Sequence, residues 1–253
     1  MVGFRSYRDQ WMSEGFADFS ASLFLQSAYG EDGPKKFKKF WDDERKFITE
    51  KNADGFRAID VGPLTLGYRL NNSRAGFNIA RDLIYPKGAY IVHMLRMMMW
   101  DSDTRDQNFK EMMRDLIRSY GGSSATTEDF KAMVERHMNP DMRMIGGGKM
   151  DWFFDEYVYG TALPAYNFVS SVEKDATGVW QLHCKVTQSG VDDKFRMLVP
   201  IYLEFSGGRV IFLGRARLLG NSTFEQTIPL RGLKEAFLRA SINYYDDVLA
   251  SAN

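Results

Sequence analysis

The sequence contains a single cysteine and three histidines among its 253 residues. One cysteine cannot form an internal disulfide and cannot build a cysteine-based metal cage. The three histidines, His93, His137 and His183, are not spaced as His-x-x-x-His or any similar pair of metal ligands. A metal site made from these histidines would therefore need residues far apart in the chain to converge.

The sequence also lacks an excess of charge of either sign and any long hydrophobic run. Lys and Arg together number 33, as do Asp and Glu, so the formal net charge is zero. Bulk charge therefore gives no reason to expect a nucleic acid or an anionic membrane as a partner. No run approaches the ~20 apolar residues of a membrane span, and the first residues do not have the architecture of a signal peptide. The compartment stays open.

The composition is that of an ordinary globular protein, with 44% hydrophobic and 26% charged residues. Hydrophobic residues recur with a helical period over residues 8–160, whereas a period of two dominates residues 165–250. The pattern predicts an α+β protein with two domains. We expect a mainly helical domain over residues 1–163 and an antiparallel β-sandwich over residues 164–253.

Five helices are expected in the first domain, each from an apolar stripe with a start or stop signal. Pro suits the first turn of a helix, and Thr126 with Asp129 forms a variant of the capping box. The expected helices are residues 8–29, a segment from Gly33-Pro34, residues 85–99, residues 104–120 and a segment after Thr126.

Two segments allow more than one interpretation. Residues 35–44 combine four lysines with apolar side chains and end in Asp-Asp-Glu. A polyanion site is one interpretation, but we favour a solvated helix face with pairs of opposite charge. Residues 51–84 are rich in turn signals, yet residues 64–70 are too apolar for a disordered linker. We expect a loop or short strand laid against the active-site region.

Three separated patches contain the residues that stand out chemically. The first, residues 11–17, is a nearly all-apolar helix start with one acid, Glu14, and acids are rarely buried unless paired or metal-bound. The second, residues 85–89, reads Tyr-x-Lys-Gly-Ala, and the third, residues 152–164, is rich in aromatics and ends in Gly-Thr-Ala-Leu-Pro. Judged alone, Glu14 is an ordinary acid of a first helical turn and Tyr85 an ordinary packing residue.

Taken together and in this order, the three patches resemble the aminopeptidase N family of zinc metallopeptidases, which belong to the gluzincins. The resemblance implies the helical C-terminal part of a thermolysin-like catalytic domain followed by an immunoglobulin-like β-sandwich. It implies that Glu14 is the third zinc ligand and that Tyr85 is the catalytic tyrosine, which donates to the oxyanion of the tetrahedral intermediate. The reaction implied is hydrolysis of the N-terminal bond of a peptide substrate, with zinc as the cofactor. Ser13 departs from the family, which usually has Asn before the acid.

The His-Glu-x-x-His helix of that family is absent from the sequence. Counting the family's spacing back from Glu14 places this helix before Met1, so we expect a chain that begins just downstream of its zinc-binding histidines. Because the two histidines and the general-base glutamate are missing, we expect no tightly bound zinc and no peptidase activity from this chain alone. Two alternatives stay open. In the first, the chain is a non-catalytic peptide- or protein-binding scaffold derived from the family. In the second, it associates with itself through apolar surface exposed on the first helix.

Overall fold

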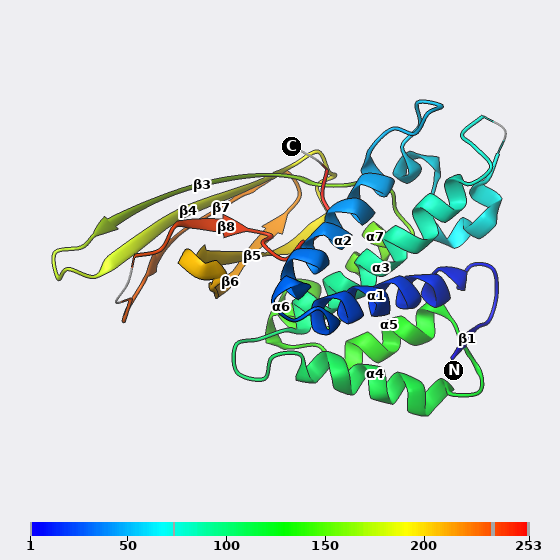
Figure 1. Ribbon diagram of the computed structural model, residues 1–253, viewed down its shortest axis with the longest axis horizontal. Helices are drawn as coiled ribbons and strands as arrows, with labels where there is room; N and C mark the ends of the chain where they lie inside the picture. The colour runs from blue at the N-terminus through cyan, green and yellow to red at the C-terminus, as the bar shows by residue number, and fades with distance from the viewer. Residues whose placement is uncertain (1, 73, 234–235, 252–253) are drawn as a thin grey trace. The chain divides into compact units, whose positions relative to one another are not determined.

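The computed structural model describes residues 2–72, 74–233 and 236–251. The chain divides into two compact units, Met1–Ala162 and Leu163–Asn253. Helices dominate the first unit and antiparallel strands the second (Figure 1). The prediction of an α+β protein, with helices first and antiparallel sheets second, is confirmed.

The first unit is built from α-helices joined by short 3-10 helices. Its α-helices are α1 (Gln10–Ala28), α2 (Gly33–Thr49), α3 (Ile79–Met99), α4 (Gln107–Tyr120), α5 (Thr127–Arg136), α6 (Pro140–Gly146) and α7 (Asp151–Tyr157). Its other elements are β1 (Gly3–Phe4), η1 (Gly30–Asp32), η2 (Ala58–Val61), η3 (Leu64–Leu70) and β2 (Ser124–Ala125), which pairs with β1 in parallel. The five expected helices correspond to α1 through α5, and the capping box at Thr126 is formed as predicted.

Helix α3 is the core of the first unit. Almost every residue from Ile79 to Leu95 is buried, and the exceptions, Arg81, Asp82 and Tyr85, lie close together near the start of the helix. Within it, His93 stacks on Trp41 of α2 with ring centroids 4.2 Å apart, which makes it a core histidine. No helix among the described residues is long and apolar enough to cross a membrane.

Helices α1 and α3 approach closely enough at a pair of glycines for their backbones to meet. A Cβ atom added to Gly15 would lie 2.5 Å from the carbonyl carbon of Gly88, and one added to Gly88 would lie 2.9 Å from the carbonyl oxygen of Trp11. Real Cβ atoms do not approach backbone this closely, so neither position accepts a side chain without moving a helix. The two glycines therefore fix how α1 lies on α3.

The start of α3 differs from the prediction. The sequence suggested a helix beginning at Tyr85 with proline in its first turn, but α3 begins at Ile79 and Pro86 lies inside it. The apolar stripe continues upstream of Tyr85, and the Asn71 side chain accepts a hydrogen bond from the backbone N–H of Ala80 at 2.8 Å. That bond satisfies one of the free N–H groups of the first turn. Tyr85 is consequently held within the helix and not at its beginning.

Helix α2 presents one buried face and one charged face. The charged face carries lysine–aspartate pairs one turn apart, as predicted. Glu44 is the exception, because it lies on the buried stripe with Phe37, Trp41 and Ile48. Its place in an Asp-Asp-Glu run predicted a solvated acid, and that prediction is wrong for Glu44, since these four positions share one side of a helix.

The described residues of the second unit form two three-stranded antiparallel sheets, ordered β3–β4–β7 and β6–β5–β8. The strands are β3 (Ala165–Lys174), β4 (Trp180–Ser189), β5 (Arg196–Glu204), β6 (Val210–Leu219), β7 (Thr223–Pro229) and β8 (Arg239–Ile242), with η4 (Ser206–Gly208) between β5 and β6. Along β4, Leu182, Cys184 and Val186 are buried and alternate with more exposed residues, as the period of two predicts. The central strand β5 is buried from Met197 to Leu203.

The glycine contact gives the first testable prediction. Alanine favours a helix over glycine by about 1 kcal/mol, so Gly15→Ala would stabilise an uncrowded helix. Because the added methyl group meets the backbone of α3, we expect a net loss of about 1–3 kcal/mol in the free energy of unfolding, measured by urea denaturation. Ser13→Ala, at an exposed position of the same helix, is the control and should change stability by less than about 0.5 kcal/mol. A Gly15→Ala protein as stable as the wild type would show that the two helices do not touch there.

Candidate active site

The two residues that the sequence singled out, Glu14 and Tyr85, lie next to each other in the first unit. Glu14 is half-buried in α1, and Tyr85 is half-buried in α3. Burial raises the pKa of the Tyr85 phenol, and hydrogen bonding of its hydroxyl to Tyr68 and to the Glu14 carboxylate raises it further. The guanidinium of Arg81, one turn earlier in α3, lies 5.6 Å from the centre of the Tyr85 ring. A carboxylate and a protonated phenol thus share one small region.

The glycine contact explains why these side chains meet. Glu14 directly precedes Gly15, and Tyr85 lies about one turn before Gly88. When the two glycines bring the helix backbones together, the residues beside them are brought within hydrogen-bonding reach. Tyr68 in η3 completes the group, so the segment between α2 and α3 does lie against this region, although as 3-10 helices rather than a strand.

Lys87, the third residue of the Tyr-x-Lys-Gly-Ala patch, has a structural partner far along the chain. Its side chain is completely buried, and its Nζ donates a hydrogen bond of 2.8 Å to the backbone carbonyl of Gly160. Burial lowers the pKa of this ammonium group to about 7. Burying an ammonium group is costly unless it is hydrogen-bonded. The hydrogen bond to Gly160 therefore holds the second patch at a fixed place against the third.

Aromatic packing holds the third patch in position. Trp152, Phe153, Phe154 and Tyr157 of α7 are all buried. The rings of Phe153 and Tyr157 stack with centroids 5.4 Å apart, and Phe154 meets Phe130 of α5 edge-on. These contacts fix the end of α7, and with it the carbonyl that receives the lysine. The three patches that are separate in the sequence therefore converge on α3.

The described residues do not provide the ligands of a catalytic zinc. Such a site uses three protein ligands and leaves one position for water. Among the described part of the chain, no three His, Cys, Asp or Glu side chains are grouped so that they could hold a metal ion. His93 is stacked in the core, His137 is bonded to Asp115 at 3.1 Å, and His183 belongs to the second unit. Glu14 has the right chemistry for one ligand, but the set as a whole does not fit zinc.

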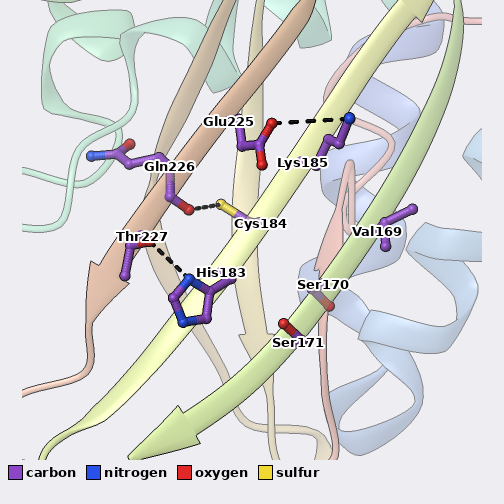
Figure 2. A pocket seen from close by; sticks show the side chains of 9 residues that line it. All are labelled: Val169, Ser170, Ser171, His183, Cys184, Lys185, Glu225, Gln226 and Thr227. Carbon is purple, nitrogen blue, oxygen red and sulfur yellow. Dashed lines mark hydrogen bonds and ion pairs between the residues drawn. The ribbon is translucent and has the colours of Figure 1, made fainter. Parts of the chain in front are cut away.

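In the second unit, a hollow of about 320 Å³ lies on the exposed side of the β3–β4–β7 sheet (Figure 2). Four of its polar side chains are paired: His183 and Thr227 are hydrogen-bonded at 2.8 Å, and Lys185 and Glu225 form an ion pair at 3.9 Å. The thiol of Cys184 donates to a backbone carbonyl of β7 at 3.3 Å, and burial raises its pKa, which makes it a poor nucleophile. We assign no chemistry to this hollow.

Two residues that help to build the region around Tyr85 could not be identified from the sequence. Lys87 belongs to the Tyr-x-Lys-Gly-Ala patch, but its burial and its distant carbonyl partner have no local signal. Tyr68 was noted only as an apolar residue in a loop, and its contact with Tyr85 depends on the path of η3. For Glu44 a signal did exist, because it shares a helical stripe with Phe37 and Trp41.

Comparison with known protein families matches residues 1–157 to the peptidase family M1 domain. The match covers more than half of the chain and contains both Glu14 and Tyr85, so this chain belongs to peptidase family M1. A search of curated proteins returned no match. The resemblance inferred from the three patches is thereby confirmed at the level of the family.

Lys87 gives a prediction with a defined pH window. The folded protein releases the Lys87 proton near pH 7, whereas an unfolded chain retains it up to about pH 10.4. Between these values the unfolded state binds more protons, so this lysine makes the free energy of unfolding rise with pH. Below this window both states are protonated, and the free-energy cost of burying the charge is constant. We therefore expect the unfolding free energy of Lys87→Met minus that of the wild type to fall as pH rises from about 7 to about 10.

Urea denaturation at a series of pH values measures this difference, in which all other titrating groups cancel. Lys110→Met, on the exposed side of α4, controls for the loss of one positive charge. If the Lys87→Met and wild-type curves stay parallel over the whole window, the lysine is not buried as an uncompensated charge.

Proposed function

We propose that Glu14 and Tyr85 are site residues of a zinc-dependent metallopeptidase that hydrolyses N-terminal peptide bonds. The observation that supports this most directly is the adjacency of a carboxylate and a phenol, held by two helices in contact, in a chain of peptidase family M1. Glu14 is the metal-ligating carboxylate, the third protein ligand. Tyr85 is the catalytic tyrosine.

Tyr85 acts as a hydrogen-bond donor in this proposal. Its raised pKa keeps the phenol protonated at neutral pH, so that the hydroxyl always has a proton to donate. When water adds to a peptide carbonyl, negative charge develops on the carbonyl oxygen, and a fixed donor aimed at that oxygen lowers the barrier. The position in the interior of α3 favours this role, because the side chain needs little reordering as the charge develops.

We propose further that these 253 residues are inactive by themselves. One carboxylate cannot hold zinc tightly, and the sequence contains no His-Glu-x-x-His motif to supply two imidazoles and a general base. The intact enzyme would carry zinc and take peptides as substrates. Residues 1–163 then correspond to the helical part of a thermolysin-like catalytic domain, and residues 164–253 to an immunoglobulin-like β-sandwich.

The second candidate is a non-catalytic module of the same descent that binds a peptide or a protein. The shortfall of metal ligands among the described residues favours it, since a binding site does not need the metal. The two candidates differ in what Tyr85 does, because only the catalytic one requires its hydroxyl.

Zinc titration tests whether this chain holds the metal tightly by itself. Titrated with zinc at neutral pH in a calorimeter, the chain should show no stoichiometric binding tighter than about 1 μM. Glu14→Gln should leave the weak residual signal nearly unchanged, because a single carboxylate contributes little alone. A tight one-to-one complex that Glu14→Gln abolishes would contradict inactivity and support the ligand role. A tight complex that survives Glu14→Gln would contradict both.

Hydrolysis of an aminoacyl anilide in the presence of zinc tests whether the chain is inactive by itself. We expect no release of the anilide above the rate of a zinc-only control. Measurable hydrolysis that Tyr85→Phe lowers by about 10²–10³-fold would contradict the predicted inactivity but support the role of the tyrosine. Hydrolysis that persists at full rate in both Tyr85→Phe and Glu14→Gln would overturn the assignment of these residues.

A further inference from the structure

A hollow of about 340 Å³ opens beside Tyr85, between α1, α2 and α3. Its volume lies at the lower end of the range for small-ligand pockets. Charged side chains from all three helices line it, together with one exposed aromatic ring and a few neutral groups. The lining residues are Asp18, Glu44, Phe47, Asn78, Arg81, Asp82, Tyr85 and Pro86.

Glu44 is the residue that makes this hollow unusual. Its relative exposure is only 8%, and it lies on the buried stripe of α2 where an apolar side chain would be expected. Its Oε2 atom is buried and has no hydrogen-bond partner among the described residues. A buried carboxyl oxygen without a partner costs stability, and native structures contain few of them. The protein keeps an acid here although an apolar residue would be more stable.

The surroundings of Glu44 oppose its ionisation. Burial raises the pKa of Glu44 to about 8, and the nearby charges of Asp18 and Asp43 add to this rise. Burial also raises the pKa of Asp18, and the charge of Glu14 raises it further. Burial raises the pKa of Asp82 as well. Arg81 is the cation that opposes these shifts in both aspartates. The hollow thus holds three acids against one guanidinium, and an added positive charge would relieve all three.

The spacing of the acids determines the kind of cation. The described residues contain no group of three acids close enough together to hold a metal ion, so Asp18, Glu44 and Asp82 do not converge on one point. A planar guanidinium has five N–H donors spread over several ångströms and can serve acceptors that stand apart. Phe47, which is 55% exposed at the rim, offers an aromatic surface for the aliphatic stem of such a side chain.

We propose that this hollow binds the guanidinium group of an arginine side chain in a peptide ligand, with Glu44 as its buried acceptor. The inference rests on the proposed function in one respect, because the ligand is taken to be a peptide reaching the region of Tyr85. Glu44 receives the innermost N–H group, and Asp18 and Asp82 contribute charge from the two sides. The preference is for arginine over an uncharged side chain of the same length.

Argininamide and citrullinamide are the matched probes for this pocket. They share shape, length and α-amino group, but only argininamide carries the guanidinium charge. Titrated in a calorimeter into the protein without added zinc, argininamide should bind at least about tenfold more tightly than citrullinamide, with a dissociation constant near about 1 mM. Glu44→Gln, which keeps the size of the side chain, should reduce argininamide affinity about tenfold, to that of citrullinamide. Glu31→Gln, an exposed acid outside the hollow, should leave both affinities unchanged.

Equal binding of the two probes, or equal binding of argininamide to Glu44→Gln and wild type, would overturn the proposal. Asp82→Asn provides a second variant on α3 in case Glu44→Gln fails to fold, and it should also weaken argininamide binding severalfold. The experiment involves neither zinc nor hydrolysis. Its failure would therefore leave the metallopeptidase proposal standing, and a failure of the zinc and anilide assays would leave this result standing.

Discussion

The backbone contact between Gly15 and Gly88 is the constraint on which the rest of the first unit depends. Because neither residue has a side chain, α1 approaches α3 closely enough for Glu14 and Tyr85 to interact. On another side of α3, Lys87 reaches the segment that follows α7 and donates a hydrogen bond to the carbonyl oxygen of Gly160. Three patches that are far apart in the sequence are thus joined through one buried helix, and a side chain at either glycine would separate them.

Much of the fold follows from the sequence because its hydrophobic periods are clear. The change of period near residue 164 predicts helices followed by antiparallel strands, and Thr126 marks the start of α5 through a capping box that forms as expected. The start of α3 was misplaced because Pro86 suits a first turn equally well in an isolated helix. Burial of the residues upstream, from Ile79 onward, decides the matter, and burial depends on tertiary packing.

The candidate site was predictable only in part. Family resemblance pointed to Glu14 and Tyr85, but the physical reason that they meet, two glycines in contact, requires the crossing of two helices. The burial of Lys87 was beyond prediction from local pattern, since charged residues are mostly exposed. Glu44 was misjudged because a run of charges usually forms a solvated face. For Glu44 the spacing from Phe37 carried the information, whereas the carbonyl partner of Lys87 lies 73 residues away.

A double-mutant cycle between Glu14→Gln and Tyr85→Phe tests the central claim most directly. The unfolding free energies of the wild type, both single variants and the double variant are measured by urea denaturation. If the glycine contact holds the two side chains together, their coupling free energy should be about 0.5–1.5 kcal/mol. Additive effects, with a coupling below about 0.3 kcal/mol, would mean that the two side chains do not interact and would contradict the account.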